Sequence, residues 1–86
     1  MLMEFRIDNE RSADRLCADV ERVLEEANVL FEENDRKFSC HIPDLLSFEV
    51  RVEEERFFIK STELHHRLFF YAIVDEFVRV MNLVRD

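Results

Sequence analysis

The sequence predicts an α+β fold in which two helices pack on one face of an antiparallel sheet. Apolar residues recur every three or four positions near both ends of the chain and at every second position between them. Hydrophobic residues make up 48% of the 86 residues, which indicates a folded chain and a single domain over residues 1–86. The expected order of elements is β-α-β-β-β-α, with the first strand optional.

The first 35 residues are expected to form a short strand and a long amphipathic helix. Apolar residues alternate over residues 2–8, which is the period of a half-buried strand. The helix is expected to begin at Asp8 or Asn9, either of which can act as an N-cap, and to end at Asn34–Asp35. Its predicted apolar stripe consists of Ala13, Leu16, Cys17, Val20, Val23, Leu24, Ala27, Leu30 and Phe31.

Three strands are expected in the middle of the chain. Apolar and polar residues alternate over residues 37–42, 46–52 and 56–60, and Pro43 separates the first two of these segments. The last two strands are expected to form a hairpin. Because the chain has no Gly, we expect this hairpin to use a loop of three or more residues instead of a tight primed turn.

The last predicted element is a long and unusually apolar helix over residues 64–84, preceded by the N-cap candidates Ser61 and Thr62. Its apolar residues cover more of the helix circumference than one sheet face can bury, so a second surface should cover the remainder. That surface could belong to a second copy of the chain or to a target protein. The residues expected in a homodimer interface are Phe69, Phe70, Ile73, Phe77, Val80 and Met81.

Negative charge is concentrated in the N-terminal part of the chain. Residues 1–35 contain eleven acids and four bases, a net charge of −7, whereas residues 36–86 contain nine acids and eight bases, a net charge of −1. The acids crowd the expected C-terminal half of the first helix, where the helix dipole is already negative. The sequence therefore predicts a surface that binds a basic partner, and the alternative is a solvated face that maintains solubility. The predicted partner-binding residues are Glu21, Glu25, Glu26, Glu32, Glu33 and Asp35.

Composition also argues against several classes of partner and location. The twelve bases are scattered among twenty acids, so direct nucleic-acid binding is not expected. No apolar run approaches the length of a membrane span, and the N-terminus lacks the features of a signal peptide. Cys17 and Cys40 fall on predicted apolar faces, where a buried thiol is the usual interpretation. These observations predict a cytoplasmic protein without membrane contact.

No group of residues predicts enzymatic chemistry. His65 and His66 are adjacent on the predicted last helix, so their side chains point about 100° apart and cannot hold one metal ion together. Cys40 and His41 are neighbours on a strand and point to opposite faces. Asp75 is expected to pair with an arginine one helical turn later. We therefore expect no cofactor, no metal and no catalytic site, although a small enzyme with its site at a dimer seam is a further alternative.

The chain resembles two types of small protein. The first resemblance is in small size and acidic composition, the second is in the order of elements, and neither includes a shared motif. Small acidic chains without catalytic motifs are similar to phage-encoded inhibitors such as anti-CRISPR proteins, and to immunity proteins that neutralise toxins. This resemblance implies a non-enzymatic module that blocks a basic target, one that handles nucleic acid. The order helix, three strands, helix is also similar to that of bacterial secretion chaperones. That alternative implies a chaperone or assembly subunit that binds an extended segment of its partner.

Overall fold

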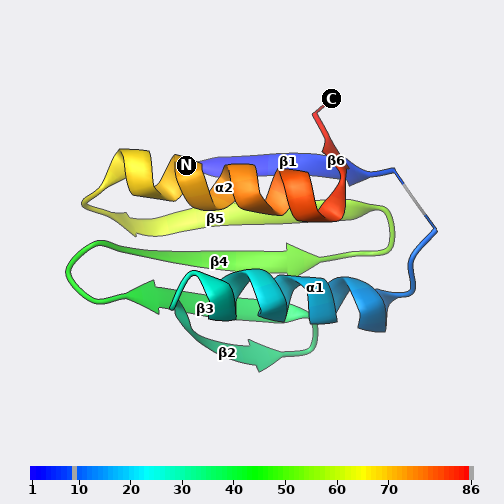
Figure 1. Cartoon of the computed structure of the whole chain (residues 1–86), viewed down its shortest axis with the longest axis horizontal. Coiled ribbons are helices and arrows are strands. Elements are labelled where there is room, and N and C mark those ends of the chain that lie inside the picture. Colours follow the sequence, from blue (N-terminus) through cyan, green and yellow to red (C-terminus); the bar gives the residue numbers. More distant parts are fainter. Residues whose placement is uncertain (9, 86) are drawn as a thin grey trace.

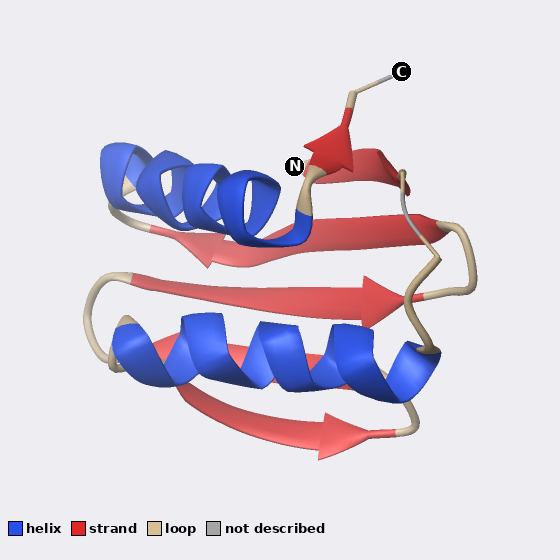
Figure 2. Cartoon of the chain, turned by 45° about the vertical axis from the view of Figure 1, so that its right-hand side comes forward, coloured by secondary structure: helices blue, strands red, loops and turns tan. Residues whose placement is uncertain are grey.

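The computed structural model describes residues 1–8 and 10–85, and these form a six-stranded antiparallel sheet with two helices on one face (Figures 1 and 2). The predicted fold class is confirmed. The sheet contains more strands than expected, because a strand follows each helix. The elements in chain order are β1 (Leu2–Ile7), α1 (Ala13–Glu26), β2 (Leu30–Asn34), β3 (Lys37–Ile42), β4 (Leu46–Val52), β5 (Arg56–Leu64), α2 (Arg67–Met81) and β6 (Leu83–Val84).

The strand order across the sheet is β2-β3-β4-β5-β1-β6. Strands β2 to β5 follow one another as an antiparallel meander, and β1 pairs with β5 from Leu2 opposite Lys60 to Arg6 opposite Arg56. The first strand is therefore an integral, inner strand of the sheet. Its apolar side contributes Phe5, which is completely buried beneath the helices.

Helix α1 is shorter at both ends than predicted, because its N-cap lies later and its last predicted turns are not helical. Its N-cap is Ser12, whose hydroxyl accepts a hydrogen bond from the Arg15 backbone N–H at 3.2 Å. The expected start at Asp8 is therefore wrong, and Asn9 lies outside the described residues. The helix ends at Glu26 because Asn28 adopts a left-handed conformation with φ of 58°, which a helix cannot continue through.

The segment expected to be the last turns of this helix is strand β2. It pairs with β3 from Leu30 opposite His41 to Asn34 opposite Lys37. Only Asp35 and Arg36 connect the two strands, with φ values of 52° and 64°. Two consecutive positive φ values define a type I′ turn, so a tight primed turn forms here without Gly. The loop of three or more residues expected between β4 and β5 is confirmed, since β4 ends at residue 52 and β5 begins at residue 56.

Helix α2 is also shorter than expected, because its predicted ends are strands. Ser61 and Thr62 lie within β5 and not at a helix N-cap. The N-cap is His66, whose Nδ1 accepts a hydrogen bond from the Phe69 backbone N–H at 3.1 Å. Asn82, with φ of 52°, ends the helix in a left-handed cap, and β6 then pairs with β1.

Aromatic side chains from the sheet and from α2 fill the space between the layers. The rings of Phe48 and Phe70 lie edge to face with their centroids 6.2 Å apart, and those of Phe57 and Phe77 are 5.2 Å apart. Such pairs stabilise a fold beyond the area that they bury. Phe70 and Phe77 therefore fix α2 on strands β4 and β5.

Candidate protein-binding surface

Three carboxylates from two elements meet at one flank of the molecule. Glu21 and Glu25 lie one turn apart on α1, and Glu33 lies on the neighbouring edge strand β2. The side chains of Glu21 and Glu33 are hydrogen-bonded to each other. We call Glu21, Glu25 and Glu33 the acidic surface.

The close approach of these groups changes the protonation of Glu21. Desolvation of its half-buried side chain raises the pKa of Glu21 above its usual range. The hydrogen bond that protonated Glu21 can donate to Glu33, and the negative charges of Glu33 and Glu25, raise this pKa further. Glu21 therefore loses its proton less readily than an isolated glutamate does.

The other predicted partner-binding acids do not lie on one face of a helix. Glu32 and Glu33 are consecutive residues of a strand, so Glu32 points to the opposite face of the sheet. Asp35 lies in the β2–β3 turn. Glu26 lies at the end of α1, close enough to α2 for its charge to raise the pKa of Arg79 after the larger effect of Glu76. The expected row of acids along a negative helix end is therefore wrong.

Bases near α1 pair with residues outside the acidic surface. Arg22 approaches Asp19 at 3.6 Å, and not Glu25 or Glu26 as its spacing suggests, and Arg11 also binds Asp19. In the part of the chain that the structure describes, no base lies within 4 Å of the carboxylates of Glu21, Glu25 or Glu33. These acids are thus available to an external cation.

The two cysteines belong to the hydrophobic core. Burial raises the pKa of the Cys40 thiol to about 12, with a smaller contribution from Glu49. Burial also raises the pKa of Cys17, and the charge of Glu33 adds to this effect. Both thiols are free and protonated near neutral pH. Among the described residues, no three His, Cys, Asp or Glu side chains are arranged to hold a metal ion.

The structure buries most of the predicted dimer interface in the chain's own core. The exposed fraction is zero for Phe70, Phe77 and Met81 and 4% for Ile73. Phe69 and Val80 are half-buried. The sheet and α1 together cover the apolar side of α2, so those four side chains need no second chain to cover them. The homodimer stays a prediction, with a smaller candidate surface than expected.

A small apolar hollow lies between the two helices. It has a volume of about 180 Å³ and contains hydrophobic side chains from both helices, with one carboxylate at its edge. Sequence reasoning missed this hollow because its two walls are more than forty positions apart in the chain. Its lining residues are Val23, Ala27, Phe69, Ala72, Ile73 and Glu76.

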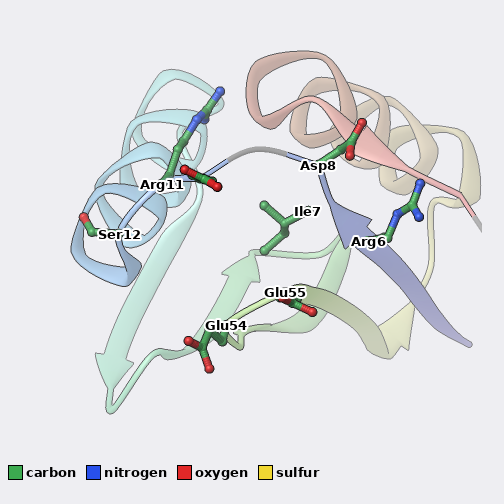
Figure 3. A pocket seen from close by; sticks show the side chains of 8 residues that line it. Arg6, Ile7, Asp8, Arg11, Ser12, Glu54 and Glu55 are labelled. Carbon is green, nitrogen blue, oxygen red and sulfur yellow. The ribbon is translucent and has the colours of Figure 1, made fainter.

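A larger, more polar hollow of about 620 Å³ lies near the end of β1. Figure 3 shows that its side chains come from the end of β1, the segment before α1 and the β4–β5 turn. Arg6 and Arg11 lie among four acids there, and Arg11 is already bound to Asp19. This mixture of charges selects neither an anion nor a cation.

The open face of the sheet gathers several of the bases. A hollow of about 280 Å³ on this face contains Lys37, Arg51 and Lys60. The guanidinium of Arg51 lies 4.6 Å from the centre of the Phe58 ring, and Lys37 approaches Glu49 at 3.6 Å. The bases are thus less scattered than the sequence suggests, although two of these three already have partners within the chain.

No protein-family model matches the chain, and no significant match exists among curated proteins or solved structures. Neither helix, within the described residues, combines the length and the apolar character needed to cross a membrane. Function is therefore inferred from the surfaces described above.

Proposed function

We propose that this chain is a non-enzymatic protein-binding module that uses its acidic surface to bind a basic protein. By occupying the basic surface with which that protein contacts nucleic acid, the module would block it. The observation that carries this proposal is the contact between Glu21 and Glu33, two acids that, among the described residues, have no base within 4 Å.

Such a contact is unfavourable in the free protein and becomes favourable in a complex. Two carboxylates held together repel each other whenever both are ionised. A lysine or arginine side chain from a partner can bind oxygen atoms of both carboxylates and so replace their repulsion with charge-assisted hydrogen bonds. Structural features that lower stability in the free protein are common at functional surfaces.

The net charge of the chain supports the same partner class. At −8, the chain attracts basic proteins over distances comparable to the Debye length, which accelerates their association at low salt. A cluster of carboxylates can also occupy the phosphate-binding surface of a nucleic-acid-binding protein, which is how a small acidic protein can compete with nucleic acid.

A pull-down with a charge-reversed variant tests this proposal. The variant carries Glu21→Lys, Glu25→Lys and Glu33→Lys. The control carries the same change of charge at Glu10, Glu54 and Glu55, which line the polar hollow near β1. Both variants are compared with the wild type at low salt and at about 0.5 M salt, where exposed charges are strongly screened.

We expect the wild type and the control to capture a basic nucleic-acid-binding protein at low salt and to release it at high salt. The acidic-surface variant should capture none, and the captured protein should lose its nucleic acid when wild type is added. Capture that is unaffected by salt and by the acidic-surface variant contradicts the proposal. That result favours the chaperone or assembly-subunit alternative, which relies on apolar contacts.

A further inference from the structure

The apolar hollow between α1 and α2 continues into an exposed apolar patch on α2. Leu68 is 77% exposed, the most exposed of the large hydrophobic residues in the described part of the chain. It lies four positions before Ala72, so the two side chains are neighbours on the same helix face. Ala72 is itself exposed and lines the hollow. We call the hollow together with Leu68 the interhelix groove.

The groove has the size of a site for one side chain. Its volume of about 180 Å³ is smaller than the roughly 300–1,000 Å³ of pockets that bind a drug-sized molecule. The base of the groove is formed by core residues, because Val23 and Ile73 are 3% and 4% exposed. A single bulky apolar side chain would therefore find a preformed apolar contact there.

The charges at the rim indicate which partner supplies that side chain. Glu76 lines the groove, and Glu26 lies at its α1 side within electrostatic range of α2. Arg79, a base near this rim, is bound to Glu76 at 2.7 Å. The rim is thus acidic overall, and the acidic surface lies on the opposite flank of α1.

A second copy of this chain fits the groove less well than a cationic partner. It would bring a net charge of −8 towards another −8, and in a symmetric contact through both grooves its Glu26 and Glu76 would face the same residues of the first copy. Most of the apolar area of α2 is already buried, so little remains to offset this repulsion. A cationic segment has the opposite balance, because its charges are attracted to both flanks of α1.

We propose that the interhelix groove receives an apolar anchor residue from a basic amphipathic segment, whose cationic side chains lie on the carboxylates around α1. This inference rests on the proposed function and specifies the chemistry of its partner. It corresponds to the general mode in which an amphipathic helix places its apolar face in a groove. Affinity would come mainly from the anchor and the rate of association from the charges.

The test uses defined peptides in place of an unknown partner. The first is a synthetic helical peptide of Lys and Leu, the second has Ser in place of Leu, and the third has Glu in place of Lys. Each is titrated into the ¹⁵N-labelled full chain, and amide shifts and affinities are measured. The protein variants are Ala72→Gln, which places a neutral polar side chain in the groove, and Ala18→Gln, the same change on the exposed side of α1.

We expect the Lys/Leu peptide to shift the amides of Ala27, Phe69 and Ala72 and to bind roughly tenfold or more tightly than the Lys/Ser peptide. Ala72→Gln should remove this advantage, whereas Ala18→Gln should preserve it. Equal binding of both Lys peptides, or an unaffected Ala72→Gln variant, overturns the groove assignment and leaves the proposed function intact. If the Glu/Leu peptide binds as tightly as the Lys/Leu peptide, the inference that the partner is cationic is wrong.

Two further outcomes separate the remaining explanations. If neither Lys peptide binds in a salt-dependent manner, the proposed function fails together with this inference. If the groove amides instead shift with protein concentration alone and sedimentation shows a dimer, the occupant is a second copy, and the cationic anchor is wrong.

Discussion

The type I′ turn between β2 and β3 predicts that replacing Arg36 with Gly stabilises the protein. Arg36 has φ of 64°, a region in which the side chain of a residue other than Gly costs about 1–2 kcal/mol. Gly removes this cost but has more freedom in the unfolded chain, which offsets about 0.5–1 kcal/mol. We therefore expect a net gain of about 0.5–1 kcal/mol, equivalent to a rise in Tm of about 2–8 °C for a domain of this size.

Urea and thermal unfolding of matched variants can separate the backbone from the side chain. Arg36→Ala removes the guanidinium but keeps Cβ, so its stability should stay within about 0.5 kcal/mol of the wild type. Ala18→Gly makes the opposite comparison on the exposed face of α1, where Gly should cost about 1 kcal/mol. If Arg36→Gly is no more stable than Arg36→Ala, the positive φ has no cost and the reasoning is refuted.

Three other predictions concern the acidic pair, the core and the thiols. Glu33→Gln should raise the free energy of unfolding at pH 7 by up to about 1 kcal/mol, whereas Glu32→Gln should change it little. Because the pKa of Glu21 is raised in the folded state, the wild type should gain stability as the pH falls through that pKa. Thermal melts should therefore show that the stability advantage of Glu33→Gln over the wild type shrinks at lower pH. An advantage that stays constant with pH contradicts the pairing of Glu21 with Glu33. Phe77→Ala should cost about 3–5 kcal/mol in urea unfolding, and a loss below about 1 kcal/mol would show that this ring is not a core residue. Cys40 should resist iodoacetamide at pH 8 until the chain unfolds, as read by mass spectrometry, and modification of the native protein would contradict its pKa of about 12.

The strands β3, β4 and β5 could be predicted from sequence because their alternation is regular and long. Strand β4 has four buried residues at every second position, and β3 and β5 have two each. The overall class follows from this alternation and from the two apolar helical stripes. Strand β6 could not be predicted, since two residues carry no measurable period and its pairing depends on β1 from the other end of the chain.

Strand β2 was missed because its two apolar residues are adjacent and show no strand alternation. Leu30 and Phe31 continue the three- and four-residue spacing of α1, and the helix interpretation extends naturally through them. The local signal against it is Asn28, one of the few residue types that adopt a left-handed conformation at low cost. Asn34 and Asp35 then provide a second turn signal six residues later. Two turn signals around a short segment favour a strand over a helix end.

The assignment of Leu30–Asn34 to a strand also decides which carboxylates lie close together. On a helix, consecutive residues lie about 100° apart, so Glu32 and Glu33 would share one broad face. On a strand they point to opposite faces, so Glu33 joins Glu21 beside α1 while Glu32 lies on the open face of the sheet. Composition thus locates the excess of acid within the first 35 residues. The Glu21–Glu33 pair, however, depends on whether the five residues of β2 form a strand or a helix, and on a β2–β3 turn that contains no Gly. Sequence charge alone could not have distinguished Glu33 from Glu32, and the two single variants compare them directly.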